Sequence, residues 1–325
     1  MSRAILPIAD RRTTTRHAWA LLRSHRGPLT VSVLLFAVVG FAGIVPPFVL
    51  GSIVDVVNSG DGTARDVLVR SAVIVGAAIA GAVATTGSAV LLAQAANPAL
   101  ARLREEVLDR ALHQDTERLE AAGTGDLMSR VGDDVRQISE SLDNAIPEFV
   151  RAGVAIAFTA IGLFALDWRL ALAGLLAAPF YVLALRWYLP RSAPFYRRER
   201  IAQGERAEAL VAGVHGAATL RALGREAGAR GRIHHHSRAA LSQAVQVFAL
   251  LTRLFGRINF AEWVGLTAVL TTGFLLVRAD AITIGAATAA ALYFHRLFNP
   301  IGAVLMIFDQ IQSSGASLAR LVGVL

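Results

Sequence analysis

The chain has 325 residues, of which 54% are hydrophobic and 17% charged, and its mean hydropathy of +0.52 exceeds what a soluble domain needs to fill its core. It contains no cysteine, which excludes a disulfide framework and a cysteine-based metal site. The 32 basic residues are all arginine and give a net charge of +8, but they are sorted by position relative to apolar segments, which indicates membrane topology and no nucleic-acid partner.

The first 28 residues carry six arginines and lack the small-residue cleavage pattern of a signal peptide. Trp19, Leu21 and Leu22 lie among Arg16, Arg23 and Arg26, which predicts a short helix lying along the cytoplasmic membrane surface. We therefore expect a cytoplasmic N-terminal segment at 1–28 and a membrane domain at 29–325.

Six segments are apolar and about 20 residues long or longer, which is enough to span a bilayer. We place them at 29–50, 67–95, 147–166, 168–189, 254–277 and 282–308. The links alternate in length. Those at 51–66, 167 and 278–281 are short, whereas those at 96–146 and 190–253 each exceed about 50 residues.

Charge predicts the orientation of these spans. Of the 32 arginines, 26 precede the first span or lie in or beside the two long links. The positive-inside rule then places both termini and both long links in the cytoplasm of a multi-pass protein, which we expect in the plasma (inner) membrane.

The long links are predicted to be helical rather than irregular. Leu100, Leu103 and Val107 continue an apolar stripe below the second span, and the second link repeats the pattern over 197–208 and 237–251. About 20 extra helical residues project ~30 Å from the membrane. Two helical hairpins of this length need a partner at their tips.

The stretch at 121–138, AAGTGDLMSRVGDDVRQI, links the first tip to the third span. Its Gly-Thr-Gly break suits a turn, and apolar residues from Leu127 onward recur every three or four positions, as on one face of a helix. Arg130 and Asp134 fall on the other faces. We therefore expect them to be in water, on a helix that continues directly into the membrane.

Glu262 and Arg296 are the most informative polar residues within the spans. Both lie 17 residues from the turn near Ala279, so an antiparallel hairpin would hold them at one depth, and charges there face the interior of a bundle by default. They form either a substrate-contacting or gating pair in a translocation cavity, or an ion pair that only clamps two helices. His295, Asn259 and Asn299 are further cavity candidates, for which a satisfied polar group at a helix contact is an equal alternative. Pro300 is expected to bend the sixth span.

No other pattern indicates chemistry. His234, His235 and His236 are consecutive, so on a helix they point about 100° apart and do not converge on one ion. We find no nucleophile and base with suitable spacing. We therefore predict no catalytic, cofactor-binding or metal-binding residue in this chain.

Several patches resemble a known family, the transmembrane domain of ABC transporters of the exporter type (type-1 exporters, type IV fold). The patches are TGDLMSRVGDDV at 124–135, DWRLALAGLLAAPF at 167–180, EALVAGVHGAATLRALGRE at 208–226, ITIGAATAAALYFHRLFNPIGAV at 282–304 and SLARL at 317–321. Each is loose alone, but their order and spacing are specific. The fold expected is an all-α membrane domain with six transmembrane helices and two long cytoplasmic extensions.

The resemblance implies partners. Two such halves, identical or related, build one pathway, and the tips of the cytoplasmic links act as coupling helices in grooves of nucleotide-binding domains, which hold ATP and Mg. By position the tips are near 117–127 and 214–226. The residues expected to contact the ATPase domain are Gly123, Thr124, Gly125, Asp126, Leu127, Gly216, Thr219, Leu220 and Arg221.

The chain itself has no phosphate-binding loop or signature motif, so ATPase activity would belong to a domain fused beyond residue 325, which we favour, or to a separate polypeptide. The function expected is the permease half of an ATP-driven exporter of an amphipathic, lipid-like, drug-like or peptide molecule. An importer of a metal chelate within the same family is the alternative. An ion-coupled secondary transporter, a different class, predicts short loops and internal symmetry that this sequence lacks.

Overall fold

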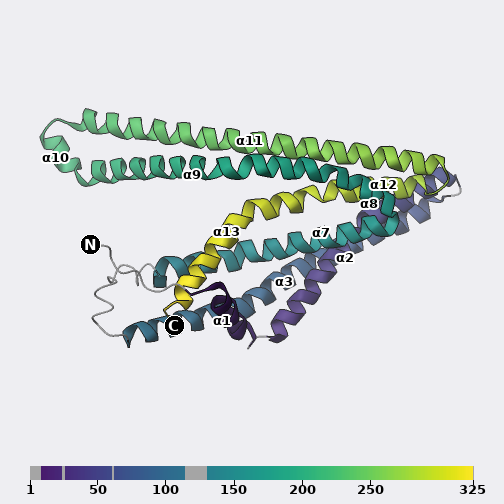
Figure 1. The fold of residues 1–325 in the computed structure, drawn as a ribbon, viewed down its shortest axis with the longest axis horizontal. Coiled ribbons are helices and arrows are strands. Elements are labelled where there is room, and N and C mark those ends of the chain that lie inside the picture. Colours follow the sequence, from purple (N-terminus) through teal and green to yellow (C-terminus); the bar gives the residue numbers. More distant parts are fainter. Residues whose placement is uncertain (1–8, 24–25, 61, 114–129, 325) are drawn as a thin grey trace. The chain divides into compact units, whose positions relative to one another are not determined.

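The computed structural model describes residues 9–23, 26–60, 62–113 and 130–324 (Figure 1). Every regular element within these ranges is a helix, which confirms the predicted all-α class. The chain forms two compact units, one made of the residues up to 171 together with those from 269 onward, and the other of residues 172–268. The two units are described separately below.

Six helical segments in the described ranges are long and apolar enough to cross a membrane, as predicted. They are Arg26–Ser59, Ala64–Arg110, Gly132–Leu166, Trp168–His215, Glu226–Arg278 and Ile284–Val322. Only 6% to 33% of the most apolar stretch of each is buried within the chain. Exposing this much apolar surface to water is unfavourable, so the exposed faces of these helices require lipid or another subunit to cover them.

In the first unit, α2 (Arg26–Ser59) packs along α3 (Ala64–Leu112), α7 (Ile146–Leu166) and α12 (Ile284–Arg296). Two small residues permit this packing. Gly40 lies so close to α7 that a Cβ there would come within 2.5 Å of the Phe158 ring. Buried Ser32 donates to the carbonyl of Ser88 on α3 at 2.9 Å. Small residues at such contacts let the backbones of spanning helices approach.

The C-terminal part of α2 contacts the N-terminus of α12 through the carboxylate of Asp55 and through two glycines, Gly51 and Gly285. Asp55 accepts hydrogen bonds from the Gly285 amide at 2.7 Å and from the Thr283 hydroxyl at 2.8 Å. A Cβ on Gly285 would lie 2.1 Å from the carbonyl oxygen of Gly51, so the two backbones are in direct contact. A negative charge at a helix N-terminus is favourable because the first amides there have no helical partner.

Individual residues mark the points at which the spanning helices end or are interrupted. Asp167 is extended and separates α7 from α8 (Trp168–Gly174), and Asp280, with φ of 54°, lies in the turn after α11 (Glu226–Arg278). The sixth span is interrupted at Leu297, between α12 and α13 (Phe298–Val322). Pro300 lacks the amide that would bond back across this point, so it bends the span as predicted.

The third span is preceded by a helix that is not regular. From residue 130, where the described part resumes, it consists of a π-helical turn η1 (Arg130–Asp134), α6 (Val135–Glu140) and a second π turn η2 (Ser141–Ala145), and then enters α7. The spacing of apolar residues predicted the helix but not the two π turns. Such turns insert one residue into the helical repeat and so rotate the residues that follow.

At the other end of the first unit, α1 (Arg11–Arg23) contacts α3 and α13. Asp10 caps α1 by accepting from the Thr13 amide at 3.0 Å, and this bonding, chiefly that from Thr13, lowers the pKa of its carboxyl group. The Ala9 amide donates to the Ala319 carbonyl at 3.0 Å, and His17 Nε2 lies 3.4 Å from Glu106 Oε2. A helix was predicted here, and it is anchored to the polar parts of α3 and α13.

The second unit is a helical hairpin. After the short η3 (Leu175–Ala177), α9 (Ala178–His215) leads through α10 (Ala217–Ala222) into α11, which returns antiparallel (Figure 1). Phe180 and Phe260 stack edge to face at 5.6 Å near one end of the hairpin, and His236 lies 3.5 Å from Glu205 farther along. Gly224, with φ of 64°, allows the reversal after α10.

Candidate functional site

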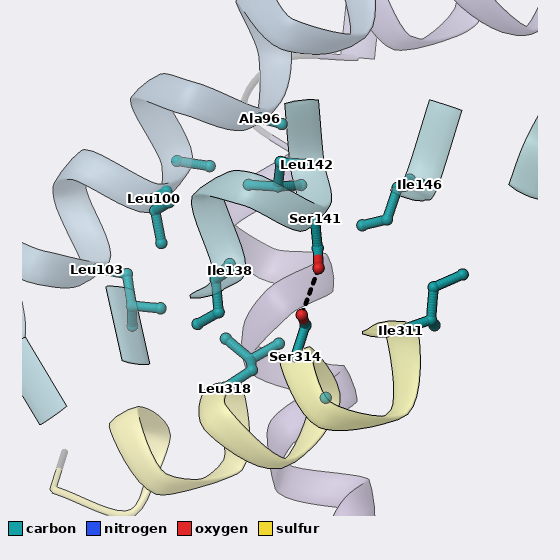
Figure 2. Close-up of a pocket in the computed structure, with 12 residues that line it drawn as sticks. Ala96, Leu100, Leu103, Ile138, Ser141, Leu142, Ile146, Ile311, Ser314 and Leu318 are labelled. Atoms are coloured by element: carbon teal, nitrogen blue, oxygen red, sulfur yellow. Dashed lines mark hydrogen bonds between the residues drawn. The ribbon is translucent and has the colours of Figure 1, made fainter. Parts of the chain in front are cut away.

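An apolar cavity of about 310 Å³ lies between α3, the α6–η2 segment and α13 in the first unit (Figure 2). Its walls are almost wholly hydrocarbon. The continuous helix made of η1, α6, η2 and α7 is called the third helix below, and it is distinct from α3. The walls are formed by Ala96, Ala99, Leu100 and Leu103 of α3, by Ile138, Ser141, Leu142 and Ile146 of the third helix, and by Ile311, Ser314, Gly315 and Leu318 of α13. A cavity of this chemistry offers water no hydrogen-bonding partners.

The two polar side chains of the cavity wall bond to each other. Ser141 in η2 and Ser314 in α13 share a short hydrogen bond, drawn as the dashed line in Figure 2, and both residues are buried. Two carbonyl oxygens, that of Gln310 at 2.9 Å and that of Gln137 at 3.3 Å, lie within reach of the single Ser314 hydroxyl proton. The hydroxyl groups therefore connect the third helix to α13 rather than lining a polar pocket.

A second set of polar contacts joins the same two helices. Asp134 in η1, whose side chain is 6% exposed, accepts from Arg320 Nε at 2.8 Å and from a second guanidinium nitrogen, and Ser317 donates to it at 3.0 Å. Arg130, which is 1% exposed, donates from Nη1 to the Arg320 carbonyl at 2.6 Å. We call Arg130, Asp134, Ser141, Ser314, Ser317 and Arg320 the polar seam.

The positions of Arg130 and Asp134 correct the sequence analysis, which placed both in water. The prediction was wrong because it considered the helix alone, without α13. Burying a charge is costly unless partners compensate, and α13 supplies an ion pair for Asp134 and a carbonyl acceptor for Arg130. The neighbouring Asp133 and Arg136, in contrast, are exposed.

The two π turns supply the polar seam from the third helix. Arg130 and Asp134 belong to η1 and Ser141 to η2, while the apolar residue between them, Ile138, lies in α6 and is buried. Below the cavity Ile138 joins an apolar cluster with Leu103, Val107 and Leu321. The third helix and α13 are therefore held together by both apolar packing and buried hydrogen bonds.

The seam was not found from sequence, although two signals were present. Asp134 lies in the patch at 124–135 and Ser317 and Arg320 lie in the patch at 317–321, and both patches carry the family resemblance. The structure shows that these two patches contact each other, although they lie far apart in the chain.

The tip of the second hairpin is exposed. Of the predicted contact residues, Thr219 and Arg221 on α10 are exposed, and Gly216 and Leu220 are partly buried. Two apolar side chains that flank this short helix are in solvent as well, with Val214 74% and Leu223 66% exposed. The structure therefore places a short transverse helix with an apolar surface where sequence predicted a tip.

The predicted contacts of the first tip, Gly123, Thr124, Gly125, Asp126 and Leu127, lie outside the described residues.

The predicted cavity residues divide between the two units. Arg296 and His295 end α12 in the first unit and are exposed, as is Asn299 at the start of α13. The Arg296 guanidinium lies beside α2, where Nη2 would be 3.3 Å from a Cβ on Gly43. These three residues therefore cluster at the break in the sixth span.

Glu262 and Asn259 belong to α11 in the second unit. Glu262 is partly buried and interacts electrostatically with Tyr181 on α9, and Asn259 is exposed. The pairing of Glu262 with Arg296 stays a prediction.

Comparison with known proteins gives the class. The family model described as the ABC transporter transmembrane region matches residues 29–301. A multidrug efflux ATP-binding/permease protein of Mycobacterium bovis (strain BCG) is 29% identical over 309 residues, which cover 93% of this chain and 25% of the relative.

Two further relatives agree. A fatty acid ABC transporter ATP-binding/permease protein of Mycobacterium bovis is 25% identical over 76% of this chain and 39% of its own length. An ATP-dependent lipid A-core flippase of Cupriavidus metallidurans is 21% identical over 89% of this chain and 48% of its own length. The chain thus spans between a quarter and about half of the length of these curated relatives.

The chain belongs to the family of ABC transporter transmembrane regions, of the exporter type, because the family model covers most of its length. Its six spans and the exposed helical tip fit that family.

Proposed function

We propose that this chain is the membrane-spanning permease half of an ATP-driven exporter, which moves an amphipathic, lipid-like, drug-like or peptide molecule out of the cytoplasm by alternating access. The asymmetric arginines favour the plasma (inner) membrane, with both termini and the polar helical extensions in the cytoplasm. The names of the relatives, which concern multidrug efflux, fatty acids and lipid A-core, favour an amphipathic substrate.

The observation that carries the proposal is the exposed tip of the hairpin formed by α9 and α11. An isolated short helix with apolar flanks, Val214 and Leu223, gains free energy when a partner covers it. A nucleotide-binding domain that holds ATP and Mg, fused or separate, is the partner that the family implies. Gly216, Thr219, Leu220 and Arg221 would then contact it, together with the first tip at Gly123, Thr124, Gly125, Asp126 and Leu127.

The polar seam gives this partner a mechanical connection to the membrane. Because the seam holds α13 to the third helix, a displacement of either one carries the other with it. Both continue into spans, α7 and α12, so motion at the cytoplasmic ends reaches the bilayer. A second copy of this chain or a related chain would complete the pathway.

Substrate contact is proposed for the polar residues at mid-membrane depth. Glu262, Arg296, His295, Asn259 and Asn299 would line the cavity between the two halves, where charged residues in spans are retained for function. The alternative role for Glu262 and Arg296 is an ion pair that only holds two helices together.

The role of the tip is tested by measuring whether ATP turnover still responds to transported compounds when the tip is altered. In the complete transporter, with its ATPase domain, Leu220→Asp is expected to leave basal ATP turnover but to abolish its stimulation by amphipathic compounds, because a carboxylate does not dock in an apolar groove. ATP-dependent accumulation of a fluorescent amphiphile in inverted vesicles is expected to fall at least about tenfold. Arg232→Gln, an exposed change on α11, is the matched control.

Retained stimulation and transport in Leu220→Asp would refute the coupling role. The direction of transport is read in the same assay. Export gives ATP-dependent accumulation inside inverted vesicles, whereas import gives accumulation only in right-side-out vesicles loaded with ATP. Glu262→Gln tests the cavity, since unchanged transport and stimulation would leave only the clamping role for that residue.

A further inference from the structure

The α9–α11 hairpin contains a second cavity, of about 610 Å³, that is chemically unlike the first. It lies wholly within the second unit, and its lining includes the stacked rings of Phe180 and Phe260. Its lining combines aromatic and aliphatic side chains with two arginines. The lining residues are Phe180, Leu183, Ala184, Trp187, Arg253, Gly256, Arg257 and Phe260.

The arginines are organised around one indole ring. The Arg257 guanidinium, from α11, lies 3.7 Å from the ring centroid of Trp187, on α9, and Arg191 approaches the same ring at 5.2 Å. Arg253 lies one helical turn from Arg257 and receives a hydrogen bond on its carbonyl from the Arg257 Nη1 at 3.1 Å.

This arrangement concentrates positive charge without an anion. Within the described part of the chain, none of Arg191, Arg253 and Arg257 lies within 4.0 Å of a carboxylate, and the cavity lining contains no acidic residue. Glu262, the nearest acidic residue along α11, interacts with Tyr181 and does not line the cavity. Three cations held close together repel one another, and a bound anion offsets this repulsion.

The remainder of the lining selects what kind of anion fits. Phe180, Leu183 and Phe260 present hydrocarbon toward the apolar stretch of the two spans, whereas the arginines of α9 begin at Arg186, next to Trp187. A soluble anion would leave these aromatic rings uncovered. An anionic lipid covers both parts, with its phosphate at the arginines and an acyl chain along the rings, and tryptophan and arginine are enriched at the headgroup level of membranes.

We propose that this cavity binds an anionic phospholipid of the bilayer, with its phosphate held by Arg253 and Arg257 and one acyl chain against Phe180, Leu183 and Phe260. The site lies outside the proposed translocation residues and does not depend on transport. It would fix the membrane depth of the hairpin whose tip meets the ATPase domain.

Trp187 provides the measurement. This chain contains four tryptophans, so replacing Trp19, Trp168 and Trp263 by phenylalanine leaves Trp187 as the only tryptophan of the membrane domain. Its fluorescence is recorded in vesicles that contain brominated phosphatidylglycerol or brominated phosphatidylcholine, since bromine quenches only tryptophan that is in contact with the labelled chain. We expect stronger quenching by the anionic lipid.

The variants separate headgroup from chain. Arg253→Gln is expected to reduce the relative affinity for phosphatidylglycerol roughly fivefold, and the double change with Arg257→Gln more than about tenfold, because each arginine near an anionic headgroup contributes a similar attraction. Arg253→Lys should retain the preference. Arg238→Gln, an exposed arginine farther along α11, is the matched control and should change nothing.

Gly256→Leu tests the acyl chain. Gly256 lines the cavity and a Cβ there meets no atom within 4 Å, so the backbone leaves room for a leucine side chain to enter the cavity. Quenching by the chains of both lipids should then fall while the charge is unchanged. Equal quenching by the two lipids in the unaltered site, or an anionic preference that survives removal of both arginines, would overturn the proposal.

Discussion

The carboxylate of Asp134 and the guanidinium of Arg320 are joined by a double hydrogen bond, although 186 residues separate them in the chain. Asp134 is nearly inaccessible to water, whereas the Arg320 side chain is 42% exposed. The pair fixes the last helix of the domain to the base of the third span. The charge of the buried Asp134 is paired with Arg320 and hydrogen-bonded by Ser317, and both partners belong to α13.

Asp134→Ala is therefore expected to lower the free energy of unfolding by about 1–3 kcal/mol, less than the loss of a fully buried pair because solvent screens the exposed guanidinium. Thermal unfolding in detergent measures the effect. A double-mutant cycle with Arg320→Gln should show a coupling energy of at least about 0.5 kcal/mol. Purely additive single effects would mean that the bond is not an important contact.

The short bond between Ser141 and Ser314 predicts an asymmetry between single and double changes. Ser141→Ala should cost about 1–2 kcal/mol because it removes a partner from a buried hydroxyl group. The double change with Ser314→Ala should cost less than the sum of the two singles, since it leaves apolar groups in an apolar wall. Unfolding in detergent is again the measurement, and Gln312→Ala, at an exposed position two residues before Ser314, is the control.

The contact between Gly285 and Gly51 leaves no room for a methyl group. Gly285→Ala would place its Cβ 2.1 Å from a backbone carbonyl and 2.4 Å from the Asp55 carboxylate, so α2 and α12 must separate and lose the cap. We expect a loss of at least about 2 kcal/mol.

The control for that change is Gly153→Ala on α7, where a Cβ meets no atom within 4 Å. There the alanine should stabilise the helix by roughly 0.5–1 kcal/mol. If both changes shifted thermal unfolding in the same direction, the tight contact between the two glycines would be refuted.

Asp10 predicts a pH dependence for the docking of α1. The Thr13 side chain and the neighbouring amides hold the pKa of its carboxyl below the ordinary value of 3.8 in the folded protein. The cap therefore contributes above about pH 4 and is lost as the pH falls through the lowered pKa. Hydrogen–deuterium exchange should show α1 less protected at pH 3 than at pH 5.

Substitutions separate the charge of Asp10 from its role as a cap. Asp10→Asn should keep α1 protected and remove most of the pH dependence, because asparagine caps nearly as well without titrating. Asp10→Ala should expose α1 at both pH values. An unchanged pH dependence in Asp10→Asn would assign the effect to another group.

The amino-acid sequence alone determined the all-helical class, the six spans, the turns at Asp167 and Asp280, the break near Pro300 and the existence of a second tip. These features follow from composition and spacing within one segment, because hydrophobic length and periodicity act locally along the chain.

Only the tertiary structure decided that Arg130 and Asp134 are buried and that Trp187 lies against Arg257. Each depends on a side chain from another helix. Whether a charge on a helix meets water or a partner is set by what packs on that face, and the periodicity of a single helix does not contain this information.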